Sequence, residues 1–254
     1  MASLKIIPAD VPRIAIPKTL SYLLAFLLLE FTCMQAHELI HHLTGRLVCG
    51  AWGTMTFNLF YLAPECFETK KIALLSTFAG PALSYFLMWA GMLLVLKNRG
   101  GLFGLSLIFA NLPFARFISV VMARGDEMLI GRRLIGEGAY PLVLGAVVLI
   151  LLPPLLVAQK AIANKRRWSI FLSFLLLTLA YDALTKRVLL APLIDRWELF
   201  ASNVFGIPLF IVCVDVAVLL ALACFSPDLY ERKKLGRPAS NGRVLDKSVV
   251  MQNS

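Results

Sequence analysis

Charged residues are scarce in this sequence. Only 16% of its 254 residues are Asp, Glu, Lys or Arg, while 59% are hydrophobic. A soluble domain has roughly 25% charged and about 45–50% apolar residues. This shortage of charge excludes an ordinary water-soluble fold, because so large an apolar surface requires an apolar solvent. The composition predicts an integral membrane protein that lies in the lipid bilayer.

Histidine and cysteine are also few, and no extended basic face is present. The chain has three histidines, which cannot supply the several histidine clusters of a membrane di-iron enzyme. Its five cysteines are odd in number and form no CxxC pair, so we expect no disulfide framework. The net charge of +10 lies in short loops and the C-terminal tail, which argues against nucleic-acid binding.

Long apolar runs account for the excess of hydrophobic residues. A helix crosses a bilayer core with about 20 mostly apolar residues. The runs show no period-two alternation, so they are helices and not strands. The sequence therefore predicts an all-α, polytopic membrane helical bundle with about six transmembrane helices. They are expected at residues 19–43, 72–96, 102–123, 140–158, 168–190 and 204–225.

The apolar runs divide the chain into four parts. Residues 1–18 contain three prolines and are expected to form an interfacial N-terminal segment. Residues 19–135 hold the first three helices, and residues 136–225 hold three more. The polar, basic residues 226–254 are expected to be a disordered tail. The loop at residues 46–71 contains an aromatic, β-prone stretch, which predicts either a short β-hairpin or an interfacial loop.

The distribution of positive charge gives a first indication of orientation. With six spans, both termini lie on one side, and that side carries more lysine and arginine than the other. The positive-inside rule then favours cytoplasmic termini, although the excess comes entirely from the tail. We expect a multi-pass protein, of a bacterial cytoplasmic membrane, and the orientation stays open.

One motif with recognisable chemistry, HELIH, lies near the end of the first expected helix, at residues 37–41. His37 and His41 are four residues apart, so both imidazoles lie on one helix face and can bind one Zn²⁺ at roughly 2.0–2.1 Å. Glu38 is adjacent and is expected to act as the general base toward a water molecule. Ionisable residues inside a span are energetically costly, which favours a metal site over a chance match.

A catalytic zinc needs a third protein ligand and an open coordination position. His42 points about 100° away from His41 on the helix, which leaves carboxylates as candidates. Asp126 follows the third expected helix, and the first and third helices end on the same side of a bundle. We therefore predict His37, His41 and Asp126 as the metal ligands, with Glu127 as the alternative third ligand.

Other ionisable residues lie within the expected helices. Glu30 shares the helix face of His37 but lies about 10 Å deeper, too far to bind the same zinc. Asp182 and Lys186 have the spacing of a local ion pair. We expect these residues and Asp215 to be structural, unless the chain transfers ions or protons through them.

These motifs resemble the site-2 protease group of intramembrane zinc metalloproteases, the M50-type peptidases. HELIH matches the zinc-binding motif of the first core helix in that group, and AGPALS at residues 79–84 is similar to a small-residue stretch of the second. ANLPF at 110–114 and GDE at 125–127 resemble the Asn-Pro and Asp-Gly elements of the third. In this chain, however, Pro113 is two positions after Asn111 instead of three, and Glu127 stands where the group has glycine.

The resemblance covers roughly residues 19–135 and implies an intramembrane metalloendopeptidase. It implies that His37, His41 and Asp126 bind zinc, that Glu38 is the base, and that the substrate is a membrane protein or peptide. Members of the group usually place this site near the cytosolic face, which the charge distribution here does not favour. The alternative hypothesis is a non-enzymatic protease-like membrane protein or a transporter.

Overall fold

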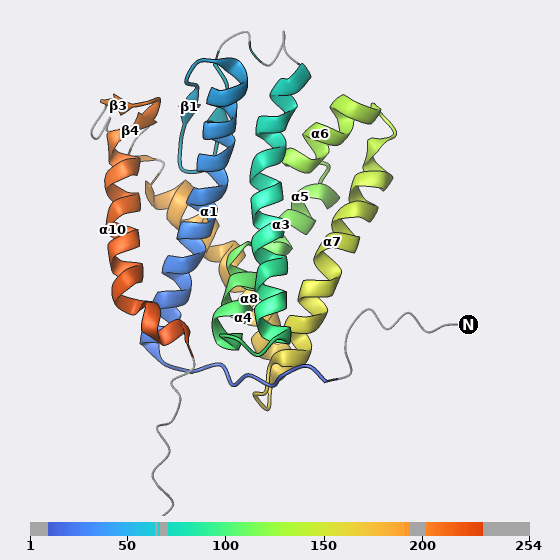
Figure 1. The fold of residues 1–254 in the computed structure, drawn as a ribbon, viewed down its shortest axis with the longest axis vertical. Coiled ribbons are helices and arrows are strands. Elements are labelled where there is room, and N and C mark those ends of the chain that lie inside the picture. The colour runs from blue at the N-terminus through green and yellow to red at the C-terminus, as the bar shows by residue number, and fades with distance from the viewer. Residues whose placement is uncertain (1–9, 64–65, 67–70, 191, 194–201, 231–254) are drawn as a thin grey trace, which may run out of the picture.

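The computed structural model describes residues 10–63, 66, 71–190, 192–193 and 202–230 (Figure 1). The start of the expected N-terminal segment and nearly all of the expected tail lie outside these residues. The elements are α1 (Leu20–Cys49), β1 (Thr54–Met55), β2 (Phe60–Tyr61), η1 (Lys71–Ala73), α3 (Leu74–Leu96), α4 (Gly101–Ala110), α5 (Pro113–Val121), α6 (Asp126–Ile135), α7 (Ala139–Ala161), α8 (Arg167–Asp182), η2 (Ala183–Leu190), β3 (Asn203–Val204), β4 (Ile207–Pro208), α10 (Leu209–Phe225) and η3 (Ser226–Leu229).

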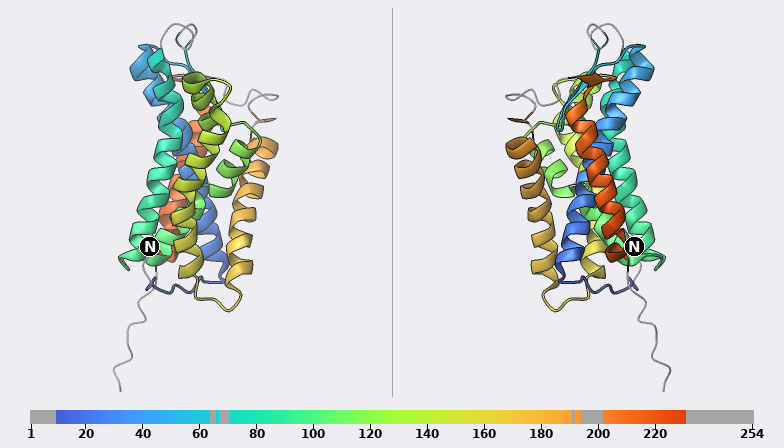
Figure 2. Two further views of the ribbon diagram at one scale, coloured as in Figure 1. Left: turned by 90° about the vertical axis from the view of Figure 1, so that its right-hand side faces the viewer. Right: turned by 90° about the vertical axis from the view of Figure 1, so that its left-hand side faces the viewer.

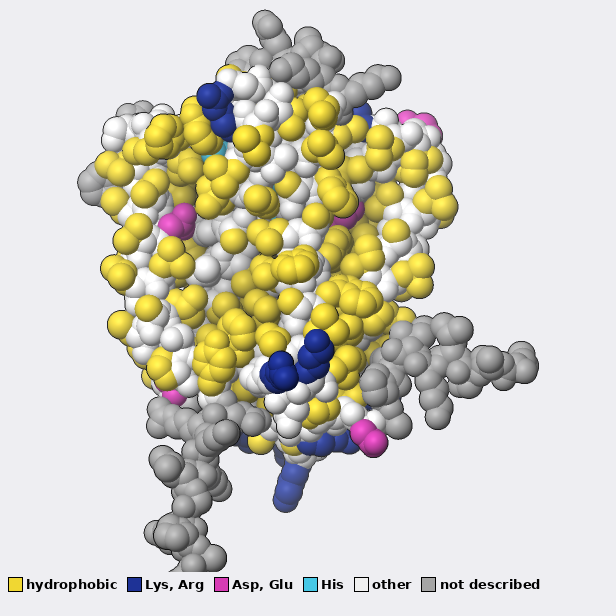
Figure 3. Space-filling model, viewed as in Figure 1, with side chains coloured by type: hydrophobic (Ala, Val, Ile, Leu, Met, Phe, Trp, Pro, Cys, Tyr) yellow, Lys and Arg dark blue, Asp and Glu magenta, His cyan; other side chains and the backbone are white. Residues whose placement is uncertain are grey.

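The all-α prediction is confirmed. Among the described residues, six helical segments are long and apolar enough to cross a membrane, each formed by one helix or by two consecutive ones. Figure 3 shows hydrophobic side chains over the middle of one face, with lysine and arginine side chains near its two ends. Such a surface suits a bilayer, where a belt of apolar side chains contacts lipid tails and charges lie near the headgroups. The chain is a multi-pass integral membrane protein.

Helix α1 lies at the centre of the bundle. It packs against α3, α4 and α10, while α8 lies behind these helices in the view of Figure 1, as Figure 2 shows from the side. The largest hydrophobic cluster joins α1, α4 and α8 through aromatic rings. The ring of Phe174 lies 4.8 Å from that of Phe26 and 5.2 Å from that of Phe109, measured between centroids. These contacts fix the depth and rotation of α1 relative to its neighbours.

Glycines allow α3 and α4 to cross closely. A Cβ atom at Gly91 would lie 2.6 Å from the carbonyl oxygen of Gly104, and a Cβ atom at Gly104 would lie 2.6 Å from that of Gly91. Small residues at such crossings let two membrane helices approach through their backbones. The crossing thereby holds the third span against the second.

The third span is interrupted, where the sequence predicted one continuous helix at residues 102–123. Helix α4 ends at Ala110 and α5 begins at Pro113, with Leu112 between them in the left-handed region at a φ of 49°. Proline lacks a backbone N–H and disfavours a right-handed helical conformation in the residue before it. The break starts α5 anew, and the chain then leads from α5 through a glycine turn into α6.

The loop that follows α1 forms the short β-hairpin that the sequence allowed. Strands β1 and β2 are antiparallel, with Thr54 opposite Tyr61 and Met55 opposite Phe60. The expectation of no disulfide was wrong, because Cys49 at the end of α1 is bonded to Cys66 beyond the hairpin. The hairpin returns the chain to the end of α1 and so brings together two cysteines that are 17 positions apart.

The β3–β4 turn covers the same end of the bundle. The Met55 N–H donates a hydrogen bond of 3.1 Å to the carbonyl oxygen of Gly206. His42 Nε2 lies 2.8 Å from the carbonyl oxygen of Phe205, and its ring stacks on Trp52. His42 therefore joins α1 to this turn, which agrees with its direction away from the other two histidines.

Candidate metal centre

The structure brings together the three residues that the sequence predicted as metal ligands. His37 Nε2 and His41 Nε2 are 3.0 Å apart, and Asp126 Oδ2 lies 3.4 Å from each of them. One ligand atom from each residue lies within 4.8 Å of the others, so this group could hold a metal ion. Two neutral imidazoles and one carboxylate form a donor set that suits a divalent transition metal.

Asp126 reaches the histidines from a turn between helices. It is the first residue of α6, and Gly125 before it has a φ of 86°, which strains residues that carry a side chain. Burial acts to raise the pKa of the Asp126 carboxyl, but His37 and His41 outweigh burial and bring this pKa below its ordinary value. The two imidazoles thus favour the ionised form of this carboxyl, which is the form that binds a metal.

Helix α3 orients both imidazoles. His41 Nδ1 lies 2.6 Å from the carbonyl oxygen of Ser76, which can only accept, so Nδ1 carries the proton of the neutral ring. The lone pair of Nε2 is then directed at the other candidate ligands. His37 Nδ1 lies 3.1 Å from Ser84 Oγ and 2.7 Å from Nη2 of Arg116, which can only donate, so His37 Nδ1 accepts in this arrangement. Hydrogen bonds of this kind orient histidines that bind metals.

The imidazoles fit against α3 because residue 80 has no side chain. A Cβ atom at Gly80 would overlap His41 Nε2 and would lie 2.6 Å from His37 Cε1. The preceding and following residues of α3 continue the helix without interruption. Gly80 therefore lets α3 approach α1 closely enough for its polar groups to reach both histidines.

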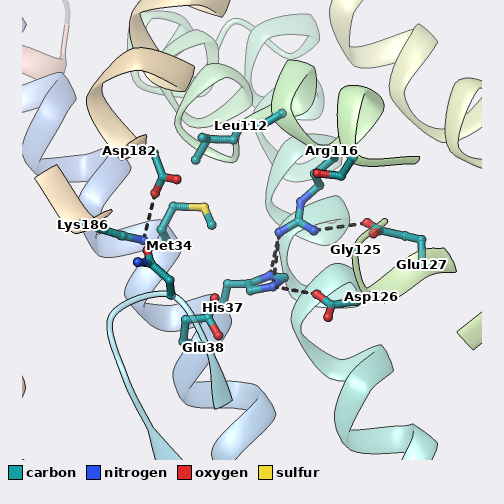
Figure 4. A pocket seen from close by; sticks show the side chains of 13 residues that line it. Met34, His37, Glu38, Leu112, Arg116, Gly125, Asp126, Glu127, Asp182 and Lys186 are labelled. Carbon is teal, nitrogen blue, oxygen red and sulfur yellow. Dashed lines mark hydrogen bonds and ion pairs between the residues drawn. The ribbon is translucent and has the colours of Figure 1, made fainter. Parts of the chain in front are cut away.

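Glu38 is beside the metal group and faces a pocket (Figure 4). The pocket has a volume of about 150 Å³, and its lining includes Glu38, His37 and Asp126. Only 7% of Glu38 is exposed. A carboxylate thus lies next to the candidate metal group in a space that admits water molecules.

No protein-family model, curated protein or solved structure matches this chain. Membership of the metalloprotease group therefore stays a prediction. The chemistry of the site has to follow from its own residues, including three that the sequence did not place there: Arg116, Asp182 and Lys186.

Arg116 of α5 is the first of these. Its Nη1 donates to Glu127 Oε1 over 3.2 Å, and its Nη2 donates to Ser84 Oγ over 3.0 Å and lies 2.7 Å from His37 Nδ1. Tyr85 also donates to Glu127 Oε1, over 2.7 Å. Glu127, the alternative third ligand, thus holds Arg116 and is not part of the metal group. An arginine inside an apolar span was the available signal for this role.

Lys186 and Asp182 line the opposite wall of the pocket (Figure 4). Lys186 Nζ lies 3.2 Å from Asp182 Oδ1, which confirms the ion pair predicted from their spacing. The side chain of Lys186 is only 3% exposed, and the residue belongs to the π-helix η2. Such helices are frequent at functional sites. The last three spans therefore contribute two charged groups to the site.

Two other residues that the sequence singled out lie away from the metal group. Asn111 is fully buried at the break between α4 and α5. Its Nδ2 donates a hydrogen bond of 2.8 Å to the carbonyl oxygen of Leu107. It does not line the pocket. Glu30 is buried within α1 and is not among the residues that could hold the metal.

Proposed function

We propose that this chain is an intramembrane zinc metalloprotease that hydrolyses peptide bonds in or near a membrane span. The observation that carries the proposal is the meeting of His37, His41 and Asp126, with the carboxylate of Glu38 in the adjoining pocket. All four residues lie on or beside membrane helices. A substrate segment could reach them only from the bilayer or its surface.

Zinc is the metal that best fits these residues. Both Nε2 atoms face the Asp126 carboxylate, and the hydrogen bond from His41 Nδ1 to the Ser76 carbonyl oxygen leaves a lone pair on His41 Nε2. Three protein ligands leave a coordination position open, as catalytic zinc sites require. When bound, zinc would supply Lewis-acid polarisation of a peptide carbonyl and activation of water.

Glu38 would carry the proton in this reaction. Its carboxylate accepts a proton from the attacking water as the oxygen of that water forms a bond with the peptide carbonyl carbon. The protonated carboxyl then donates to the peptide nitrogen as the C–N bond breaks, which releases a carboxylic acid and an amine. The low exposure of Glu38 keeps competing bulk water away from this transfer.

Arg116 would stabilise the negative charge that develops on the carbonyl oxygen. Its guanidinium lies against His37 and is held there by Glu127 and Ser84, so it is already placed beside the metal group. Metal binding through His37 Nε2 would place the proton of this ring on Nδ1, and Nη2 of Arg116 would then lose its acceptor there and need another. A substrate oxygen in the pocket would provide one.

Glu38→Gln tests the proposal directly. Purified protein would be incubated with a panel of labelled membrane-spanning peptides in lipid nanodiscs, and new termini would be identified by mass spectrometry. We expect the variant to bind zinc as the wild type does and to lose cleavage. Glu30→Gln is a matched control, because it removes another buried carboxylate of α1 that lies outside the pocket, and it should cleave normally. Full cleavage by Glu38→Gln would disprove the mechanism.

A second candidate function rests on polar atoms buried within the spans. Glu30 Oε2, Gln35 Oε1 and Asp215 Oδ1 have no hydrogen-bond partner among the described residues, and Gln35 Nε2 donates to Asp215 Oδ2 over 3.4 Å. Such groups occur along ion or proton pathways. This candidate would be favoured if the purified protein contains no stoichiometric zinc and cleaves none of the peptides.

We infer further that the metal site faces away from the cytoplasm. The Cys49–Cys66 disulfide lies at the end of α1 that carries the metal group, and disulfides persist mainly in oxidising compartments. The excess of lysine and arginine on the side that both termini share also favours a cytoplasmic location for that side, opposite the metal group. After reduction, a membrane-impermeant thiol reagent should label Cys66 in intact cells, and failure to do so would reverse the orientation.

A further inference from the structure

A second cavity lies at the opposite end of the bundle from the metal group. Its volume is about 780 Å³, and its lining includes three cations and one acid: Arg13, Lys160, Arg167 and Asp10. The cations come from the N-terminal segment, the end of α7 and the start of α8. This local excess of positive charge indicates a site for an anion.

Backbone hydrogen bonds fix the segments that carry these cations. The Ile14 N–H donates a hydrogen bond of 2.7 Å to the carbonyl oxygen of Ala161. The Ala163 N–H donates one of 2.8 Å to the carbonyl oxygen of Ile14. The side-chain oxygen of Asn164 accepts a hydrogen bond of 2.9 Å from the Ile16 N–H, and its Nδ2 donates one of 3.2 Å to the Ile16 carbonyl oxygen. The N-terminal segment is thus tied to the α7–α8 connection, and the cations are held together although like charges repel.

A buried amide gives independent evidence for a ligand. Gln159 lines the cavity and is only 8% exposed, yet its Nε2 has no hydrogen-bond partner among the described residues. Buried donors are rarely left without an acceptor, and a rotation of the Gln159 side chain, which borders the cavity, would bring this donor to a ligand oxygen. The lining therefore offers an N–H donor together with the three cations.

The position of the cavity identifies the class of anion. Helix α3 ends at Leu96, α7 ends at Ala161 and α8 begins at Arg167, so the cavity lies where the apolar spans end. Lipid phosphates are found at this depth, and basic pockets between membrane helices bind anionic headgroups. We propose that the cavity binds a phosphate group, as the headgroup of an anionic phospholipid or as free phosphate. Arg13 and Arg167 neutralise its charge, and Gln159 donates to one of its oxygens.

The test compares the wild type with three variants of the full chain in nanodiscs that contain equal parts of phosphatidylglycerol and phosphatidylcholine. One is the triple variant Arg13→Gln, Lys160→Gln and Arg167→Gln. The second is Gln159→Leu, which removes the amide at nearly constant volume and keeps every charge. The matched control removes two exposed cations, Lys97 and Arg99, which lie at the same end but do not line the cavity. Lipids that stay bound are identified by native mass spectrometry, and inorganic phosphate is titrated separately in phosphatidylcholine nanodiscs.

We expect the wild type and the control to retain phosphatidylglycerol selectively. The triple variant should lose about two orders of magnitude in affinity, at roughly fivefold for each cation near the membrane surface. Gln159→Leu should weaken binding by roughly tenfold, the effect of one hydrogen bond to a charged group.

Binding of inorganic phosphate without retention of the lipid would support the same site with free phosphate as its source. Equal lipid retention by all forms, or an equal loss in the control, would overturn the proposal. Size-exclusion profiles identify any variant that has failed to fold, and in that case Gln159→Leu decides.

Discussion

Gly80→Ala tests whether the close approach of α3 shapes the metal centre. The added Cβ atom would overlap His41 Nε2 and would lie 2.6 Å from His37 Cε1, so either the imidazoles or α3 must move. Both imidazoles take their orientation from α3, through Ser84 Oγ and the carbonyl oxygen of Ser76. Any movement that relieves the overlap also disturbs these hydrogen bonds.

The size of the effect follows from one gain and two costs. Alanine in place of glycine would by itself favour the helix by about 1 kcal/mol, while overpacking of a full site costs about 1–3 kcal/mol. Loss of the partners that orient a metal-binding histidine weakens metal binding by about 10–100-fold. We therefore expect Gly80→Ala to fold with a loss of stability of at most about 2 kcal/mol and to bind zinc about 10–100-fold more weakly, with cleavage lost in proportion.

The assay is competition for zinc with a chelator of known affinity, together with zinc per protein after dialysis. Gly145→Ala is the matched control, since a Cβ atom at this glycine of α7 would meet nothing within 4 Å. Gly91→Ala is a second control, because its clash with the Gly104 carbonyl should lower stability without reaching the metal group. Zinc binding by Gly80→Ala that equals that of Gly145→Ala would refute the reasoning.

Two further predictions concern the third ligand and the disulfide. Asp126→Asn should lose stoichiometric zinc, whereas Glu127→Gln should keep zinc and lower the cleavage rate, because Glu127 only holds Arg116; metal analysis and initial rates separate the two, and equal zinc loss in both would contradict the assignment. Cys49→Ser should destabilise the loop that closes on Cys66 by about 3 kcal/mol, the value for a loop of this length. Hydrogen exchange should show faster opening of β1 and β2, and unchanged exchange would indicate that the disulfide does not constrain them.

The expected spans came close to the observed helices because composition alone sets where a chain can cross a bilayer. The first helix was the main error in length, since it continues to Cys49 past Thr44, Gly45 and Arg46, which end the apolar run. The third span was predicted as continuous although Pro113 was visible in the sequence. Its effect on the preceding residue is local, so this break could have been foreseen.

The candidate ligands were also within reach of the sequence. His37 and His41 share a helix face through the 3.6-residue period alone. Asp126 followed from counting spans, because alternate crossings of a membrane return the chain to the same side. Arg116 and Lys186 were recognisable as charges within spans, but their side chains could not be assigned to the pocket from spacing.

The sequence by itself determined the membrane class, the approximate spans and the side of the bundle on which the ligands lie. These properties depend on composition and on the geometry of a single helix. Only the tertiary structure decided that Gly80 brings α3 against the histidines, that Ser76 fixes the tautomer of His41, and that Glu127 holds Arg116 and stays outside the metal group. Such contacts join different helices, and their relative rotation depends on the packing of many side chains and not on any local pattern.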